Sequence, residues 1–549
     1  MTRAVFQRLA RRAITLAGLG AAVMAAGGAD AQGQQRRVSV HPYIEIQQAI
    51  TADFTGGDTL TYTGIGAGID ASIATRRVQA TISYNYQHQV GWNKRTRNND
   101  VHTGLAAVHF DALPGTLAFD AGAVATRSHD DINRPLPALR TVNDPSIAQI
   151  YGVYGGPTLS THAGPLTVGA SYRLGYVHVD DRGADLAPTG AGTGFARVPR
   201  YNSSTMQQAD VSIGMGTRQA PVGWTVGAGW AREDMNRLDS KYDSRYVRAD
   251  VVLPVSSNLA VTGGAGYEKT RTSQQDFVRD SAGQPVTTRN GNLVGDPSKP
   301  RLLTDNQSGL IWDVGVIWRP GPRTELQARA GRRYGGTTVT GSFEHKINKN
   351  YSFSAYVYDN ISSFGRLLIA DLGAVPKNFR VPGAATGITG IGGVGGCVFG
   401  AAGGGACFDN ALQSLNNFNF RNRGVGLLLS GGRGRWSYGI GAGYANHRYL
   451  APTGFALSGV TEQGYSLEAG IQRSLGRTSG INFATFASWY DSGLKGSSSS
   501  FNSGLTGSYY RTFINERLQG DISAGVYTSH GDNFDNTSGS LLMGLRYTF

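Results

Sequence analysis

The stretch that decides the fold is the last one, S-G-S-L-L-M-G-L-R-Y-T-F, residues 538–549. In an extended chain, alternate side chains point to opposite faces. One face of this stretch is apolar and ends in two aromatic residues: Leu541, Met543, Leu545, Tyr547 and Phe549. The other face is mainly small or polar: Ser540, Leu542, Gly544, Arg546 and Thr548. This period of two predicts a β-strand, which belongs either to a soluble sandwich or to a membrane barrel.

The same alternation recurs along most of the chain. In residues 436–444, Trp, Tyr, Ile and Ala side chains alternate with Ser and Gly, and in residues 78–86 Val, Ile and Tyr alternate with Gln, Thr and Ser. About twenty-two such segments fit between Val38 and Phe549. One of them, residues 166–179, inverts its pattern where Val177 and Val179 flank His178. We therefore expect that strand to stop near Tyr176 or to carry a bulge.

The connections between these segments alternate in length. Every other one is tight, for example at Ala163, Pro320 and Asn348, and those between are mostly longer and polar. Membrane barrels have short periplasmic turns and longer external loops, whereas a sandwich has no reason to sort its loops. We therefore predict an all-β protein, a single transmembrane antiparallel barrel of about twenty-two strands, with a range of about 18–24. Its last strand should close against the first, residues 38–53.

Composition agrees with many strands. Charged residues make up 16% of the 549 residues, against roughly 25% in ordinary globular proteins. Glycine is abundant at 78 residues, aromatic residues make up 10%, and the formal net charge is +13. Basic charge alone could suggest nucleic acid, but an exported barrel would not meet it, so we expect no nucleic-acid partner.

The N-terminus has the features of a secretory signal peptide. Arg3, Arg8, Arg11 and Arg12 precede an apolar run over residues 13–26. Ala29 and Ala31 supply the small residues of a cleavage site, so we expect cleavage before Gln32. The alternative, a membrane anchor, would need a longer apolar run. This predicts a signal peptide at residues 1–31 and a barrel over residues 32–549, in the outer membrane of a Gram-negative cell, with the outer-membrane lipid as a partner.

Alternation fails only between residues 363 and 419. Residues 364–372 and 408–415 could each form a short helix. Such a long connection is either a floppy surface loop or a segment that folds over or into the pore and narrows it. Cys397 and Cys407 are the only cysteines and lie in this loop, which contains no histidine. A local disulfide is therefore favoured over a metal site, which would need more ligands.

Charged residues on the polar face are candidates for lining the lumen. The cationic ones are Arg173, Arg248, Arg329, Arg333, Lys346 and Arg546. The acidic ones are Asp70, Asp120, Asp250, Glu268, Asp313, Glu344, Glu468 and Asp521. They either pair with one another across strands or contact a solute. No histidine has a serine and an acid placed to form a hydrolytic site, and no motif indicates a metal or cofactor, so we expect no enzyme activity.

Several segments resemble a known group of proteins. V-H-P-Y-I-E-I-Q-Q-A-I-T-A-D-F (40–54), residues 61–80 and 100–106, the cysteine loop and F-R-N-R-G-V (420–425) are similar to sphingomonad outer-membrane proteins. These are often labelled preprotein translocase subunit YajC, which we regard as a misnomer because true YajC is a small inner-membrane protein with one helix. The chain also resembles barrel proteins associated with exopolysaccharide and PEP-CTERM loci. The pattern Leu541, Met543, Leu545, Tyr547 and Phe549 is similar to the C-terminal signal that outer-membrane assembly machinery reads.

These observations together favour a channel. We expect an outer-membrane barrel that passes a polar solute or polymer, with exopolysaccharide export as the specific expectation and a polysaccharide as the corresponding partner. The alternative is a structural or surface-anchoring barrel without transport. An outer-membrane hydrolase is disfavoured because no catalytic constellation is present.

Overall fold

The computed structural model describes most of the chain after residue 36. The described residues are 37–92, 98–129, 147–180, 186–188, 195–197, 201–281, 286–288, 293–380, 397–400, 405–408, 415, 417–452, 457–493, 499–531 and 534–549. The chain divides into two compact units, Met1–Arg37 and Val38–Phe549, and the second is the barrel. The predicted signal peptide, with Ala29 and Ala31, lies outside the described residues.

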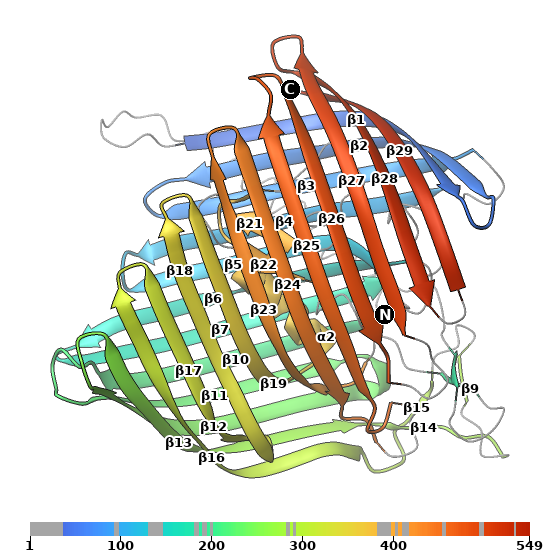
Figure 1. Cartoon of the computed structure of the whole chain (residues 1–549). Coiled ribbons are helices and arrows are strands. Elements are labelled where there is room, and N and C mark those ends of the chain that lie inside the picture. The colour runs from blue at the N-terminus through green and yellow to red at the C-terminus, as the bar shows by residue number, and fades with distance from the viewer. Residues whose placement is uncertain are drawn as a thin grey trace. The chain divides into compact units, whose positions relative to one another are not determined.

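Twenty-two strands form one antiparallel sheet (Figure 1). In chain order they are β1 (Arg37–Asp53), β2 (Thr59–Ala74), β3 (Val78–Gly91), β4 (Asn99–Leu113), β5 (Leu117–His129), β6 (Ile147–Ala163), β7 (Leu166–Asp180), β10 (Ser203–Met215), β11 (Gly223–Met235), β12 (Ser240–Pro254), β13 (Leu259–Gln274), β16 (Leu302–Gly321), β17 (Thr324–Arg333), β18 (Gly336–Asn348), β19 (Tyr351–Ser362), β23 (Phe420–Arg433), β24 (Trp436–Tyr449), β25 (Thr461–Ser474), β26 (Ser479–Asp491), β27 (Ser500–Phe513), β28 (Leu518–Gly531) and β29 (Phe534–Thr548). The predicted fold class and strand number are therefore confirmed.

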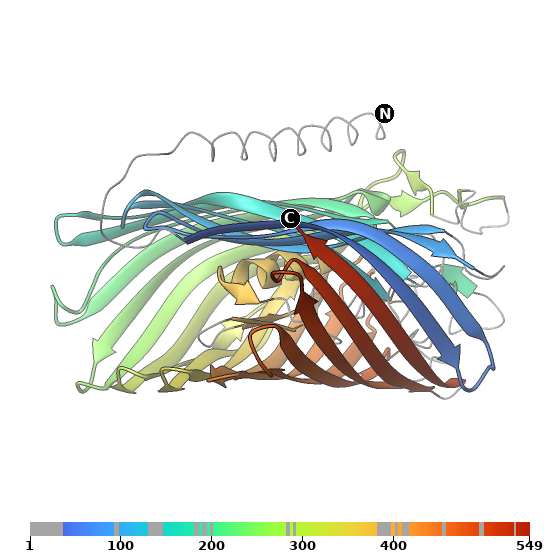
Figure 2. The same ribbon diagram turned by 90° about the horizontal axis from the view of Figure 1, so that it is seen from above.

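The sheet closes on itself. β1 pairs with β29 over the run from Tyr43 opposite Thr548 to Asp53 opposite Ser538. Figure 2 shows these first and last strands, in blue and red, side by side. The Phe549 amide donates to the Pro42 carbonyl at 3.0 Å, which extends the pairing to the last residue. No strand edge is left open within this sheet, which is the condition for a sheet to sit in lipid.

Turn lengths differ between the two rims of the barrel. At the rim where β1 starts and β29 ends, the ten connections are short, and the longest runs from residue 216 to residue 222. At the opposite rim, the longest connections span residues 181–202, 275–301 and 363–419. The connection between β17 and β18 at this rim is short and consists of residues 334–335. We call these the short-turn rim and the long-loop rim. The predicted tight turns all lie at the short-turn rim.

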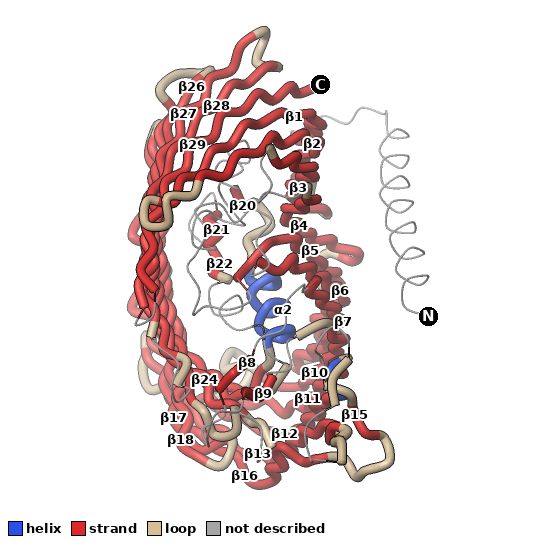
Figure 3. The backbone as a smooth tube through the Cα atoms, turned by 90° about the vertical axis from the view of Figure 1, so that its right-hand side faces the viewer, coloured by secondary structure: helices blue, strands red, loops and turns tan. Residues whose placement is uncertain are grey.

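Smaller elements lie in the long connections. They are β8 (Leu186–Pro188) with β9 (Phe195–Arg197), the 3-10 helix η1 (Arg237–Asp239), β14 (Asp276–Phe277) with β15 (Gly295–Asp296), and the group between β19 and β23. That group contains α2 (Phe364–Ala374) and the small sheet of β20 (Phe379–Arg380), β21 (Cys397–Gly400) and β22 (Gly405–Cys407). Figure 3 shows α2, in blue, inside the ring of strands. The predicted helix at residues 364–372 is thus confirmed, whereas most of the second candidate, residues 409–414, lies outside the described residues.

One strand differs from its prediction. β7 neither stops near Tyr176 nor bulges, because it keeps one register with β10 up to His178 and with β6 up to Asp180. Val177 and Val179 point to the inner face and are fully buried in the cluster that contains the α2 side chains. The inverted pattern therefore marks a change of surroundings on the inner face and not the end of the strand.

Candidate functional site

The outer surface of the wall is apolar. On β29, Leu541, Met543 and Leu545 are exposed, and on β1 so are Ile44 and Ile46, although both strands lie in the middle of a closed sheet. Exposed rows of this kind continue around the barrel, for example Leu310, Trp312 and Val314 on β16. A soluble monomer does not expose a continuous apolar belt, whereas lipid favours one. Among the described residues, no helix is both long enough and apolar enough to cross a bilayer.

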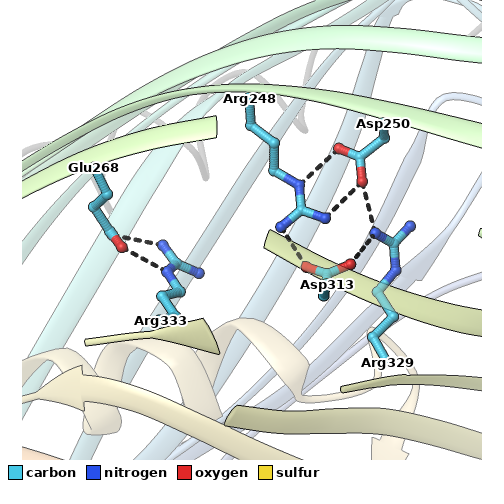
Figure 4. Close-up of polar contacts among 6 residues, drawn as sticks. All are labelled: Arg248, Asp250, Glu268, Asp313, Arg329 and Arg333. Atoms are coloured by element: carbon cyan, nitrogen blue, oxygen red, sulfur yellow. Dashed lines mark hydrogen bonds and ion pairs between the residues drawn. The ribbon is translucent and has the colours of Figure 1, made fainter. Parts of the chain in front are cut away.

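Inner-face charges of β12, β16 and β17 form a single ion-pair cluster. Arg248 donates to Asp250 through two bonds of 2.7 and 2.8 Å and reaches Asp313 at 2.6 Å. Arg329 contacts the same two carboxylates at 2.6 and 3.1 Å. Figure 4 shows these four side chains pointing toward one another. Each arginine therefore bridges both acids, and the charges cancel within the cluster.

A second pair lies beside this cluster. Arg333 of β17 makes two bonds of 2.7 Å to Glu268 of β13, also visible in Figure 4. Its guanidinium also lies 4.7 Å from the ring centre of Tyr334. Bidentate pairs of this type hold both side chains in a fixed orientation. The wall from β12 to β17 is thus lined by paired charges.

The remaining cationic candidates fall into three situations. Arg546 pairs with Asp70 and lies over the Tyr43 ring at 3.2 Å from its centre, next to the seam between β29 and β1. Arg173 lies 5.1 Å from the ring centre of Tyr154. Lys346 is exposed near the short-turn rim, and no ion pair joins it to another described residue. The structure therefore brings Arg248, Arg329, Arg333 and Arg546 into cross-strand pairs, which is the first of the two alternatives that the sequence left open.

α2 packs on the inner face of β5, β6, β7 and β10. Its buried side chains are Phe364, Leu367, Leu368, Ile369 and Leu372. They share one apolar cluster with wall residues that point inward: Leu105, Val124, Ile150, Val177, Val179 and Met206. Burial of a leucine-sized side chain contributes roughly 1.5–3 kcal/mol. The apolar face of α2 therefore accounts for its position inside the barrel.

Three glycines of the wall allow the helix to approach closely. A Cβ atom on Gly122, Gly152 or Gly175 would lie 3.2 Å from a side-chain carbon of Leu372, Leu368 or Ile369, respectively. These glycines belong to β5, β6 and β7, so their missing side chains leave room for the helix on three neighbouring strands. Larger side chains at these positions would push α2 away from the wall.

The N-terminus of α2 is held by a buried polar contact. Ser363 caps the helix, because its Oγ accepts the Arg366 amide at 3.2 Å and donates to Glu233 Oε2 at 2.6 Å. Arg366 forms an ion pair of 3.2 Å with the same carboxylate of β11, and its guanidinium lies 3.5 Å from the Tyr242 ring centre. Glu233 is fully buried. This buried charge pair ties α2 to the wall beyond the apolar contact.

A buried tyrosine lies at the same end of the helix. Tyr201 precedes β10, and its ring packs against Phe364 at 4.8 Å between ring centres. Burial first, and then the charge of Glu233, holds the pKa of the Tyr201 phenol well above its ordinary value. The phenol therefore stays neutral, and its hydroxyl hydrogen-bonds to Ser204. Because the phenol is neutral, it adds no negative charge beside the ion pair of Arg366 and Glu233.

The segment after α2 is also attached to the wall. Lys377 lies 3.5 Å from Asp120 and 3.4 Å from the Tyr154 hydroxyl, and its carbonyl accepts from Thr81 at 2.8 Å. Cys407 is disulfide-bonded, and the only other cysteine, Cys397, is its register partner between β21 and β22. The chain between β19 and β23 is thus constrained at α2, at Lys377 and at the β21–β22 pair.

Sequence reasoning missed the residues that hold α2. Glu233, Tyr242 and Arg366 were not singled out, because their partners come from segments far apart in the chain. One signal was present in the pattern: apolar residues such as Ile150, Val177 and Val179 occur on the otherwise polar face. Apolar side chains pointing into a lumen need an apolar partner inside it.

The described residues contain no group of three or more His, Cys, Asp or Glu side chains arranged to hold a metal ion. The buried pair of His447 Nδ1 and Glu462 at 2.6 Å also contacts Tyr490, which donates to Glu462 at 2.7 Å. Phe420 stacks on this imidazole at 4.2 Å between ring centres. This network joins β24, β25 and β26 near the long-loop rim, and its contacts are those of structural packing.

No family model and no curated protein matches this sequence. Among solved structures, the ferric-catecholate import receptor Fiu from E. coli K12 in its closed form is 10% identical, with a TM-score of 0.46, and the match covers 94% of this chain and 83% of that one. The FrpB iron transporter from Neisseria meningitidis, F5-1 variant apoprotein, is 10% identical over 93% and 81% of the two chains, with a TM-score of 0.44. The ferric yersiniabactin uptake receptor FyuA from Yersinia pestis is 10% identical over 94% of this chain and 81% of that one, with a TM-score of 0.43. At this identity and superposition, their substrates are not transferred to this chain.

Proposed function

We propose that this protein is an outer-membrane barrel that passes a polar solute through its lumen, and that the segment between β19 and β23 narrows the path. The observation that carries the proposal is α2 on the inner face of β5, β6, β7 and β10. A barrel of this strand number encloses a wide interior, because diameter rises with strand number. A purely structural barrel would have no need for a helix held inside by a buried ion pair.

The chemistry of the inner face supports an uncharged, hydrogen-bonding solute. The wall charges of β12, β13, β16 and β17 are paired, so they present little net charge. On the inner face of β19, Tyr356 and Tyr358 form a stacked pair 6.0 Å apart, and Tyr356 is 40% exposed. Aromatic faces and hydroxyl groups suit sugar rings, which have both apolar faces and hydroxyl groups. We infer that a polysaccharide is the solute class, and exopolysaccharide export is the specific form of this proposal.

Conductance of the reconstituted barrel tests the proposal. Deletion of residues 365–415 should raise single-channel conductance and allow neutral oligosaccharides into liposomes, with the barrel still folded. A deletion of residues 131–144 in the connection between β5 and β6 is the control, and it should leave both unchanged. If neither the full chain nor the 365–415 deletion conducts, the structural or anchoring alternative replaces transport. If only charged solutes pass, the polysaccharide class is wrong.

A further inference from the structure

The outer surface near the long-loop rim carries a row of cationic side chains that the lumen does not use. On the strands from β11 to β24, the outward-facing cationic residues near this rim are Arg232, Lys241, Arg245, Lys269, Arg271, Arg332, Arg421, Arg423 and Arg448. Carboxylates on the same surface are fewer: Asp234, Asp243 and Asp359. We call this set of cationic residues the outer cationic belt.

The strand register places the belt at the edge of the apolar surface. On β12 and β13 the outward pair Val247 and Tyr267 is followed, one step toward the long-loop rim, by the pair Arg245 and Lys269. On β23 the outward residue Val425 is likewise followed by Arg423. Val247 is 58% exposed and Tyr267 is 53% exposed, as expected for side chains that face lipid. The belt therefore begins where the lipid-facing surface ends, at the depth of lipid headgroups.

Several belt residues face like charges. Arg245 lies directly opposite Lys269, and Arg421 lies directly opposite Arg448. Like charges in such cross-strand positions destabilise a sheet unless another charge compensates them. Asp243 contacts Arg245 at 3.1 Å, and Asp359 contacts Arg421 at 2.8 Å. No carboxylate among the described residues pairs with the remaining members of these two pairs, Lys269 and Arg448.

The opposite sector of the same rim has different chemistry. Outward-facing residues of β3 and β4 form a hydrogen-bonded aromatic group, in which Tyr86 donates to Asp100 at 2.8 Å and His88 contacts the same carboxylate at 2.8 Å. Tyr84 and His102 are joined at 2.8 Å. The belt therefore does not extend over β3 and β4, where the same depth holds an aromatic and acidic group.

We propose that the outer cationic belt is a binding site for the anionic headgroups of outer-leaflet lipids. Headgroup phosphates or carboxylates would compensate the unpaired cations Lys269, Arg271 and Arg448, and arginine binds such groups through two parallel hydrogen bonds. Each Lys or Arg near an anionic lipid surface adds about 1 kcal/mol of attraction, so three of them correspond to about a hundred-fold in affinity. The site depends on the membrane placement of the barrel and not on transport.

Lipid binding by the purified full-length barrel tests this site. Native mass spectrometry should show retention of lipid A and phosphatidylglycerol in preference to phosphatidylcholine, and added salt should weaken it. The variant Lys269→Gln/Arg271→Gln/Arg448→Gln should bind the anionic lipids about a hundred-fold more weakly. The control Arg279→Gln/Lys299→Gln/Lys349→Gln has the same charge change at exposed positions in loops and should bind like the wild type.

The alternative outcomes are distinct. Equal lipid binding by the belt variant and the wild type would overturn the proposal, and so would equal weakening by the control variant, because either result removes the role of these positions. If inorganic phosphate displaces the lipid when both are added at the same total negative charge, the belt binds free anions and not lipid. Because conductance is measured separately, a failed transport assay leaves this result unaffected.

Discussion

At the scale of single residues, the buried carboxylate of Glu233 sets the position of α2. Its partners, Ser363 and Arg366, both belong to the segment inside the lumen. A buried ion pair contributes little net stability compared with a well-packed apolar pair, but breaking it leaves a buried charge without a partner. The contact therefore favours one position of the helix strongly over the alternatives.

Arg366→Ala should release α2 while the barrel stays folded. The loss of a buried partner costs about 3–5 kcal/mol, which corresponds to a rise on the order of a hundred-fold or more in hydrogen exchange of the α2 amides. Adding Glu233→Gln to this variant should restore part of the protection, because the unpaired charge is then gone. Exchange measured by mass spectrometry reports both. Unchanged exchange in Arg366→Ala would show that the apolar contact alone holds the helix.

Gly152→Leu should displace α2 by steric overlap. A Cβ at this position already lies 3.2 Å from Leu368 and 3.0 Å from Val124, and overpacking of this kind costs about 1–3 kcal/mol. Gly155→Leu is the matched control, because Gly155 lies on the same strand with its Cβ direction toward the outer face. Single-channel conductance should rise in the first variant and not in the second. Equal conductance in both would mean that α2 does not limit the path.

At the scale of elements, the strands were predictable and the contents of the lumen were not. Alternation such as that of residues 436–444 reflects a local rule, because each side chain faces either lipid or the interior. The position of α2 depends on the approach of Leu368 to Gly152 and of Ile369 to Gly175, and no local pattern encodes such pairs. Residues 166–179 show the difference: their inverted pattern predicts a strand end or a bulge, whereas in the structure it marks where Val177 and Val179 share a cluster with α2.

The two rims give a topological prediction. An epitope inserted between Asn348 and Asn350, at the short-turn rim, should be inaccessible to antibody on intact cells, because short turns of membrane barrels face the periplasm. An epitope placed at residues 494–498, between β26 and β27, should be accessible. Permeabilised cells provide the control for expression of both. Antibody labelling of the epitope at Asn348 on intact cells would show that the barrel has the opposite orientation.

At the scale of the whole molecule, the seam between β1 and β29 completes the wall. It joins the two ends of the described chain, with Ile46 opposite Leu545 and Ile50 opposite Leu541. Phe549 is 63% exposed on the outer surface, and its ring lies 5.3 Å from that of Tyr547 at an angle of 84°. The seam therefore combines backbone pairing with an aromatic edge at the short-turn rim.

Deletion of Phe549 should reduce the amount of folded barrel in the outer membrane several-fold. It removes the amide that donates to Pro42 and the aromatic residue of the proposed assembly signal. Export to the periplasm should persist, since the deletion leaves the predicted signal peptide at residues 1–31 unchanged. Heat-modifiable mobility in gels measures the folded fraction, and Phe549→Tyr should behave like the wild type. Normal assembly of the deletion variant would exclude an essential role for the terminal residue.

The short link between β19 and α2 limits how far the helix can move. β19 ends at Ser362 and α2 begins at Phe364, so only Ser363 separates the helix from the strand. The other end of the helix, about 16 Å away along its 11 residues, is followed by Lys377, which contacts Asp120 and the Tyr154 hydroxyl. Because the chain is attached to the wall on both sides of α2, a helix released from its contacts keeps a high effective concentration near the glycines of β5, β6 and β7. Return of a released helix to the wall is consequently a unimolecular step whose rate does not depend on how many copies of the protein the membrane holds.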